Sequence, residues 1–322
     1  MKAIRIQHTG KPDVMKLVEV ERPTPGPGEA LVRVEAAGIN YIDIYYRMGW
    51  YTADLPLTLG VEGAGIIEAA GLDLQGFRAG DRVAWCMYLG AYAEYALVPE
   101  RHLVHIPHGL DFESAAGALL QGMTAHYLTR STFPLQAGQT ALVHAAAGGV
   151  GLLLTQMAAQ IGARVIATVS TEEKAALARS AGAHDIIFYE QQDFAAEVKR
   201  LTDGCGADVV YDAVGRATFE KSLASLRPRG LLVIYGAASG PAPAVEPSQL
   251  ALGGSLFLTR PNLAHYTLTR QELDGRAGDV YAAIQQGKLH LHLERRYPLA
   301  DAAHAHQELE FRRTTGKGLL IP

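Results

Sequence analysis

The residues best suited to chemistry form a glycine-rich loop between an apolar strand and an apolar helix. The apolar run 140–145 leads into this loop, which reads Ala146-Ala147-Gly148-Gly149-Val150-Gly151. Positions with little or no side chain let the backbone approach a pyrophosphate, and the N–H groups that open the next helix face the anion. A second apolar run at 164–169 completes the spacing of a βαβ unit, which favours a dinucleotide site over a simple tight turn.

The end of the second strand indicates which dinucleotide is bound. An acidic residue there would bind a bare ribose hydroxyl and repel a 2′-phosphate. The chain instead has Ser170, followed by Thr171 and Lys174, and this hydroxyl-rich, cationic corner favours NADP. Ser170-Thr171-Glu172-Glu173 also has the pattern of a capping box, so Ser170 is expected to cap the next helix and Gly182 to end it. The alternative for Lys174 is a solvated surface lysine.

Composition restricts the class of protein. The chain has 322 residues, 48% of them hydrophobic and 19% charged, with a formal net charge of −4. It lacks the basic excess of a nucleic-acid binder, and its N-terminus becomes polar before a signal-peptide core forms. The two cysteines, Cys86 and Cys205, are interpreted as reduced thiols. A cytoplasmic protein with neither nucleic-acid nor membrane partners is therefore expected.

The order of elements predicts an α/β protein in which one domain interrupts another. Residues 1–122 have short strands separated by Gly and Pro, which favours a β-rich, partly closed barrel. Residues 123–260 alternate strand and helix, as in a doubly wound parallel sheet. Residues 261–322 have helical segments near 270–287 and 300–313, and their apolar ending is expected to return to the first domain. The strands expected in the middle domain are 140–145, 164–169, 185–189, 208–212, 231–235 and 255–259.

Several blocks of sequence resemble those of a known family. Gly138-Gln139-x-x-Leu142-x-x-x-Ala146-Ala147-Gly148-Gly149-Val150-Gly151-x-x-x-x-Gln156 is similar to the signature of the quinone oxidoreductase group, related to ζ-crystallin, within the medium-chain dehydrogenase/reductase superfamily. The resemblance covers nearly the whole chain and implies a GroES-like catalytic domain, a Rossmann domain, NADPH as reductant and a homodimer. Its other blocks are Gly38-Ile39-Asn40-Tyr41-Ile42-Asp43, Leu59-Gly60-Val61-Glu62-Gly63-Ala64-Gly65, Gly80-Asp81-Arg82-Val83 and Gly122-Met123-Thr124-Ala125.

Two departures from the zinc enzymes of this superfamily define the expected chemistry. Asn40 stands where those enzymes place a thiolate ligand, and Val61 where they place an imidazole ligand. No catalytic zinc is expected at these positions, and two cysteines are too few for a four-cysteine structural zinc lobe. Without a Lewis acid, hydride transfer is expected to an acceptor that stabilises its own developing anion, such as a quinone or an α,β-unsaturated carbonyl.

The resemblance also implies site residues on the catalytic side. Asn40, Asp43, Tyr45 and Tyr51 are expected to line the cleft beside the nicotinamide, with Gln121 and Thr124 near it. The alternative is that the aromatic residues only close the barrel as an amphipathic patch; these are Tyr41, Tyr45, Tyr46, Trp50 and Tyr51. The sequence shows no Ser/His/Asp arrangement and identifies no general acid, so solvent is left to deliver the proton.

On the cofactor side, the resemblance implies three groups of residues. Ala147, Gly148, Gly149, Val150 and Gly151 form the phosphate loop. Ser170, Lys174 and Tyr189 are expected at the 2′-phosphate, together with Arg312, or its neighbour Arg313, from the returning tail. The residues expected to flank the nicotinamide and ribose are Tyr235, Gly236, Ser239 and Leu258.

Two further features complete the sequence-based expectations. His290-x-His292 and His304-x-His306 are interpreted as solvated histidines, because no carboxylate or cysteine completes a ligand set. Strand 255–259 is an apolar sheet-edge candidate, which by resemblance pairs with a second copy across a two-fold axis. Its alternative is a strand covered within the monomer.

Three functions remain open from the sequence. The leading hypothesis is a zinc-independent NADPH:quinone reductase, transferring one or two electrons per encounter. A second is an NADPH-dependent alkenal or enone reductase on the same scaffold. The third is a non-catalytic NADPH-binding protein, acting as a sensor, a structural protein or an RNA-associated protein.

Overall fold

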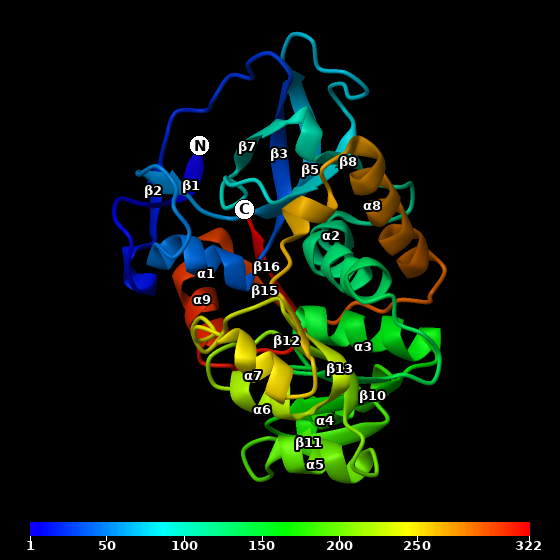
Figure 1. Ribbon diagram of the computed structural model, residues 1–322. Helices are drawn as coiled ribbons and strands as arrows, with labels where there is room; N and C mark the ends of the chain where they lie inside the picture. Colours follow the sequence, from blue (N-terminus) through cyan, green and yellow to red (C-terminus); the bar gives the residue numbers. More distant parts are fainter. The chain divides into compact units, whose positions relative to one another are not determined.

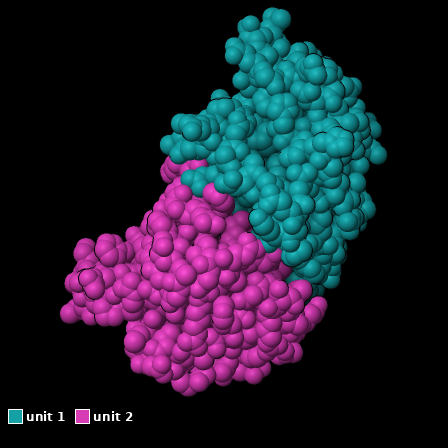
Figure 2. Space-filling model, turned by 90° about the vertical axis from the view of Figure 1, so that its right-hand side faces the viewer, with its two compact units in different colours: residues 1–123, 267–322 teal, residues 124–266 magenta.

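The computed structural model describes all residues from 1 to 322, and their contacts divide into two compact units. The first unit comprises residues 1–123 and 267–322, and the second comprises residues 124–266 (Figure 2). The α/β class predicted from the sequence is confirmed, with a β-rich first unit and a parallel sheet in the second (Figure 1).

The first unit is built on two sheets, whose longest strands, β3 and β5, have ten and nine residues and are longer than the short strands expected from the sequence. In the larger sheet the order is β15-β16-β3-β5-β6-β8, with β7 also pairing with β3. Its strands are β3 (Glu29–Gly38), β5 (Glu62–Ala70), β6 (Arg82–Cys86), β7 (Tyr95–Pro99), β8 (Leu103–His105), β15 (Leu293–Pro298) and β16 (Lys317–Ile321). The smaller sheet has the order β2-β1-β4, from β1 (Lys2–Ile6), β2 (Lys16–Glu19) and β4 (Leu57–Thr58). The unit's helices are α1 (Tyr41–Met48), α2 (Phe112–Tyr127, whose last turn belongs to the second unit), α8 (Arg270–Gln285) and α9 (Ala302–Glu310).

The C-terminal strand closes the first unit. Leu319 and Leu320 of β16 pair antiparallel with Gly38 and Ala37 of β3, so the apolar tail returns to the N-terminal part as predicted. The side chains that face inward form one apolar core that includes Ile4, Trp85 and Leu320. Burial of such side chains contributes roughly 1.5–3 kcal/mol each.

The second unit is a six-stranded parallel sheet with the order β11-β10-β9-β12-β13-β14. Its strands are β9 (Thr140–Val143), β10 (Arg164–Val169), β11 (Asp185–Phe188), β12 (Ala207–Asp212), β13 (Leu226–Ile234) and β14 (Phe257–Thr259). The connecting helices are α3 (Gly149–Ile161), α4 (Glu172–Ser180), α5 (Phe194–Leu201), α6 (Phe219–Ala224) and α7 (Pro247–Leu252). This order reverses direction between β9 and β12, which is the topological switch point where such sheets bind dinucleotides.

Four local predictions in the second unit need correction. Strand β13 begins at Leu226 rather than at residue 231, because it continues back through the polar segment Arg227-Pro228-Arg229. Strand β9 ends at Val143 rather than at residue 145, because Ala145 has a left-handed φ of 51°. Strand β14 begins at Phe257 rather than at residue 255, because Ser255 has a φ of 56°. Helix α4 is capped by Thr171 and not by Ser170, because the Thr171 hydroxyl accepts from Lys174 N at 3.3 Å.

A buried chain of polar side chains ties the middle of the second sheet together. Ser222 donates to Asp212 at 2.9 Å, so its oxygen accepts from His144 Nε2 at 3.1 Å, and Thr168 then donates to His144 Nδ1 at 2.9 Å. Burial lowers the pKa of His144, which keeps the ring neutral. The order Asp–Ser–His places the serine in the middle, so these residues fasten β9, β10 and β12 to α6 rather than form a nucleophilic triad.

None of the helices is both long and apolar enough to span a bilayer.

Candidate functional site

The glycine loop opens helix α3 at the carboxyl end of β9. Gly148 is the N-cap of α3, and a Cβ on Gly151 would lie 2.3 Å from the carbonyl oxygen of Ala145. Only glycine therefore lets the first turn of α3 pack against the end of the strand. The N–H groups of Gly149, Val150 and Gly151 begin the helix and have no partner within it, which suits them to the oxygens of a pyrophosphate.

The corner expected at the 2′-phosphate forms at the ends of β10 and β11. Ser170 follows β10 directly, and Lys174 lies in the first turn of α4. Tyr189 N donates to Val169 O at 3.3 Å, which brings Tyr189 to the same end of the sheet. All three side chains are half-buried. These three residues lie at the same end of the sheet and carry a hydroxyl, an ammonium and a phenol, a set of groups that fits the 2′-phosphate of NADPH.

The residues expected near the nicotinamide half lie at the ends of β12 and β13. Tyr235 N and Gly236 N donate to Asp212 O at 2.9 and 3.3 Å, and Ser239 Oγ donates to Val214 O at 2.8 Å. A Cβ on Gly236 would lie 2.5 Å from Ala213 O, so glycine is required there too. Leu258 lies opposite Leu232 in the β13–β14 pair. Thr124 is buried in α2, and its expected contact with the nicotinamide stays a prediction. Arg312 belongs to the first unit, and its expected contact with the 2′-phosphate also stays a prediction.

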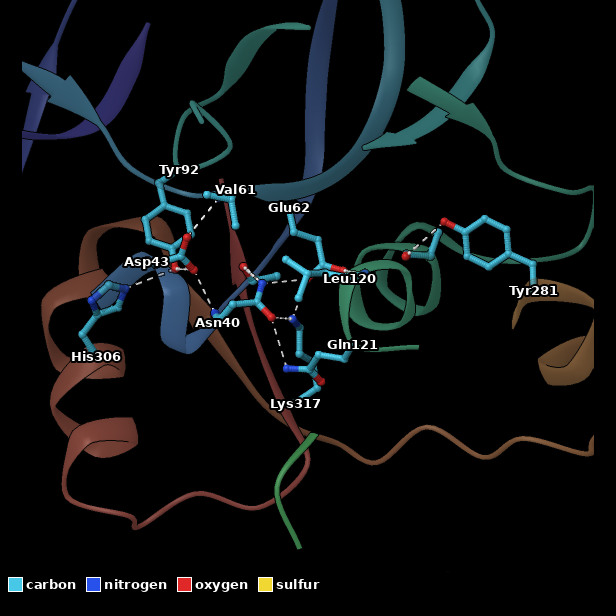
Figure 3. A network of polar contacts seen from close by, with 12 residues as sticks. Asn40, Asp43, Val61, Glu62, Tyr92, Leu120, Gln121, Tyr281, His306 and Lys317 are labelled. Atoms are coloured by element: carbon cyan, nitrogen blue, oxygen red, sulfur yellow. Dashed lines mark hydrogen bonds and ion pairs between the residues drawn. The ribbon is translucent and has the colours of Figure 1, made fainter. Parts of the chain in front are cut away.

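The first unit contains a buried network that connects several predicted site residues (Figure 3). Its centre is the Glu62 carboxylate, which is fully buried. Lys317 Nζ lies 2.6 Å from Glu62 Oε2, and Asn40 Nδ2 donates to the same oxygen at 2.8 Å. Leu120 N of helix α2 donates to Glu62 Oε1 at 2.6 Å. One carboxylate therefore joins β5, β16, α2 and the residue that precedes α1.

The Asn40 amide has a partner for each of its hydrogen-bonding positions. Its nitrogen donates to Glu62 and, at 3.3 Å, to Gly38 O. Its oxygen accepts from Lys317 Nζ at 2.8 Å and from Gln121 Nε2 at 3.2 Å. The Glu62 carboxylate also lies close to the backbone of Gly38, where an added Cβ would be 2.3 Å from Glu62 Oε2. Asn40 is thus held by the protein on all sides.

Asp43 is also held by the protein rather than directed outward. Asn40 N and Tyr92 Oη donate to its Oδ2 at 2.8 and 2.9 Å, and Val61 N donates to its Oδ1 at 3.0 Å. Burial raises the pKa of Asp43 to about 7. This carboxyl therefore anchors the backbone of both residues that stand where the zinc enzymes have ligands.

A second polar chain extends from Asp43 through Tyr92 to His306. Arg47 Nη1 lies 3.3 Å from His306 Nδ1, so that ring nitrogen accepts, and the protonated Nε2 donates to Tyr92 Oη at 3.2 Å. Burial and the charge of Arg47 lower the pKa of His306 to about 3. The interpretation of His304-x-His306 as two solvated histidines is wrong for His306, because α9 turns this ring into the unit's interior.

The aromatic residues after Asn40 form a compact cluster around Tyr45. Tyr45 is buried, its ring stacks on Trp50 with centroids 5.2 Å apart, and Tyr51 meets it edge-on at 5.5 Å. Gly49, with a φ of 78°, makes the turn that returns Trp50 and Tyr51 to α1. The alternative of an aromatic patch thus describes their packing, and the site roles of Tyr45 and Tyr51 stay proposals.

Sequence reasoning missed the charged residues that organise this region: Glu62, Lys317, Arg47 and His306. The signal available was a charge within an apolar run, since Glu62 and Lys317 both occur in buried strands. No group of three or more His, Cys, Asp or Glu side chains is arranged to hold a metal ion.

Comparisons with known proteins show which families and structures the chain resembles. A family model described as alcohol dehydrogenase GroES-like domain matches residues 26–108, and one described as zinc-binding dehydrogenase matches residues 149–271. A quinone oxidoreductase of Pseudomonas aeruginosa is 46% identical over 100% of this chain and 99% of its own. A 2-haloacrylate reductase of a Burkholderia species is 42% identical over 98% of each chain. The crystal structure of Escherichia coli quinone oxidoreductase complexed with NADPH superimposes with a TM-score of 0.98 at 40% identity, covering 100% of both chains.

Proposed function

Since this chain belongs to the quinone oxidoreductase family of the medium-chain dehydrogenases and reductases, we propose that it reduces quinones with NADPH and without a metal ion. The observation that carries the proposal is the full-length similarity to quinone oxidoreductases, combined with a phosphate corner made of Ser170, Lys174 and Tyr189 in the second unit.

NADPH, when bound, supplies a hydride from its dihydronicotinamide ring. The N–H groups at the start of α3, with Ala147 and Gly148, hold the pyrophosphate, and the phosphate corner holds the 2′-phosphate. Arg312 is proposed as a further contact to that phosphate. The residues proposed to orient the ring and its ribose are Thr124, Tyr235, Gly236, Ser239 and Leu258.

The catalytic-side residues are proposed to position and shield the acceptor. Tyr45 and Tyr51 contribute their rings, and Gln121 contributes its amide. Asn40 and Asp43 act as positioning residues, because their polar atoms are all bonded within the protein. A quinone spreads its developing negative charge over its own conjugated carbonyls, so it needs no Lewis acid, and solvent delivers the proton.

A second candidate is reduction of a carbon–carbon double bond conjugated to a carbonyl or carboxylate. The 42% identity to a 2-haloacrylate reductase favours it, because such substrates also stabilise their own anion. Non-catalytic NADPH binding is the third outcome.

NADPH oxidation measured with a panel of quinones and a panel of enones and acrylates separates these functions. We expect turnover with quinones, and kcat/KM for the best quinone above that for any enone. Turnover with acrylates alone would favour the second candidate, and cofactor binding without turnover would contradict both enzymatic readings.

Lys174→Glu is expected to raise the Kd for NADPH at least about tenfold and to leave the Kd for NADH nearly unchanged, because only NADPH presents a phosphate to this side chain. An acidic residue in the first turn complements the dipole of α4, so the variant helix remains stable. Isothermal titration with both cofactors measures the effect, with Lys174→Gln as the charge-neutral control. Equal losses for both cofactors would place Lys174 away from the phosphate.

Exhaustive chelation is expected to leave quinone reduction unchanged, because Asn40 and Val61 replace two ligands and Lys317 already occupies the oxygen of Asn40. Rates before and after dialysis against a chelator, with metal content measured in parallel, test this. Activity that returns only with added zinc would contradict it.

A cytoplasmic homodimer is proposed as the state of the protein. Both cysteines are free, which suits a reducing compartment. Strand β14 lies at the sheet edge and pairs only with β13, its residue Phe257 is 61% exposed, and Leu252 at the end of α7 is 89% exposed. An open apolar edge of this kind suits pairing with a second copy. Sedimentation of Phe257→Lys against the parent chain tests it, with a monomeric parent as the contradicting result.

A further inference from the structure

One polar atom of the buried network has no partner in the protein. Gln121 is 8% exposed; its Nε2 donates to Asn40, but its Oε1 is buried without any hydrogen-bond partner. A buried carbonyl oxygen left unpaired lowers stability, so an acceptor held in this state indicates a donor that arrives with a ligand.

The network determines which atom of Gln121 is left over. The Glu62 carboxylate and Gly38 O require the nitrogen of Asn40 to face them, and the Lys317 ammonium requires its oxygen. Asn40 therefore presents only its oxygen to Gln121, so Gln121 must answer with its nitrogen. If the Asn40 amide were reversed, its oxygen would face the Glu62 carboxylate and its nitrogen would face the Lys317 ammonium. If the Gln121 amide were reversed, its oxygen would face the oxygen of Asn40. The Glu62–Lys317 pair thus fixes the orientation of two amides in succession.

The chemistry of the proposed reaction limits what the free oxygen can accept. A quinone or enone has only acceptor oxygens and cannot donate to Gln121 Oε1. The carboxamide of the dihydronicotinamide carries two N–H donors, and a hydroquinone product carries O–H donors. Of these two donors, only the carboxamide N–H is present when the cofactor binds, so it is the donor that suits Gln121 Oε1.

We infer that Glu62 and Lys317 are positioning residues that orient Asn40 and Gln121 so that Gln121 Oε1 accepts a hydrogen bond from the carboxamide N–H of NADPH. The inference rests on the proposed function for the identity of the cofactor. It adds Glu62 and Lys317 to the residues that determine cofactor recognition, although neither has a free polar atom for the cofactor.

The test compares Kd values for NADPH and for its reduced 3-acetylpyridine analogue, in which a methyl group replaces the amide nitrogen. The parent protein is expected to bind NADPH about tenfold more tightly than the analogue, because the analogue leaves Gln121 Oε1 unpaired. In Gln121→Leu this ratio is expected to fall to about one. Gln271→Leu, at an exposed position of α8, is the matched control and should keep the parent ratio.

The ion pair is tested by Glu62→Gln/Lys317→Met, which removes both charges together and so leaves no unpaired buried ion. In this double variant the preference for NADPH over the analogue is expected to fall about threefold or more, because no charged pair then fixes the orientation of the Asn40 amide. An unchanged ratio in this double variant would overturn the positioning role, and an unchanged ratio in Gln121→Leu would overturn the carboxamide contact. A Gln121→Leu effect confined to inhibition by hydroquinone would assign the donor to the product instead and overturn the inference.

These binding ratios need no turnover. Failure of every quinone and enone in the panel would refute the proposed function while leaving the ratios measurable, and turnover with an unchanged ratio would refute only the inference.

Discussion

Lys317→Met is expected to lower the free energy of unfolding of the first unit by about 3–5 kcal/mol, because it leaves the Glu62 carboxylate buried without its cation. The ammonium lies 2.6 Å from Glu62 Oε2, and the two side chains are 3% and 0% exposed. Water cannot replace the lost partner at such burial. Urea unfolding followed by tryptophan fluorescence measures the effect, since Trp50 and Trp85, the only tryptophans, both belong to this unit.

The double variant Glu62→Gln/Lys317→Met separates the cost of an unpaired charge from the contribution of the pair itself. We expect it to recover most of the lost stability, because a neutral amide and a thioether carry no desolvation penalty of the same size. Arg22→Met removes one partner of the exposed Arg22–Glu68 pair and is the matched control, with a far smaller effect expected. If Lys317→Met costs no more than this control, the buried pair does not stabilise the unit.

The second unit could be predicted from the sequence because its signals are local. Each strand is a short apolar run, and each break is a glycine or a cap within a few residues, so the six strands and their helices follow from neighbouring residues. The largest error is at β13, which begins at Leu226 rather than at residue 231, because it continues back through the polar segment Arg227-Pro228-Arg229. The other errors are of one or two residues. They occur where Ala145 and Ser255 take left-handed conformations that their residue types do not announce.

The buried network of the first unit could not be predicted in this way. Glu62 and Lys317 are 255 residues apart in the chain, and Asn40 and Lys317 are 277 apart. No periodicity relates such residues, and only the return of β16 beside β3 brings them together. His306 shows the same limit, because the His-x-His pattern favoured a solvated ring, while in the folded chain the ring contacts Arg47 and Tyr92.

Asn40 shows how a resemblance can locate a residue correctly in the chain and leave its role open. The resemblance implied that Asn40 lines the cleft beside the nicotinamide. The four hydrogen bonds to its side chain support the proposed role, in which Asn40 orients the Gln121 amide. The residue type alone allows both roles, and only the partners distinguish them.

His306→Gln and Asp43→Asn are expected to change stability with opposite pH dependence. The folded-state pKa of His306 is about 3, below its ordinary value of 6.5, so below pH 6.5 the unfolded chain binds a proton that the folded chain does not. Acidification therefore destabilises the parent through His306, by about 1.4 kcal/mol per pH unit. The folded-state pKa of Asp43 is about 7, above its ordinary value of 3.8, so acidification from pH 7 stabilises the parent through Asp43.

The stability deficit of a variant is the difference between its free energy of unfolding and that of the parent. Its change with pH measures the contributions of His306 and Asp43 separately. His306→Gln loses hydrogen bonds at pH 7.5, but its deficit should shrink by about 2 kcal/mol on going to pH 5, because the variant escapes the cost of keeping an imidazole neutral in acid. The deficit of Asp43→Asn should instead grow by about 2–3 kcal/mol over the same interval, because the variant lacks the proton that stabilises the parent. Fluorescence-monitored urea unfolding at several pH values gives both curves. Deficits that stay constant with pH would show that neither group has a perturbed pKa in the folded chain, and the Arg47–His306–Tyr92–Asp43 chain would then have no electrostatic consequence for stability.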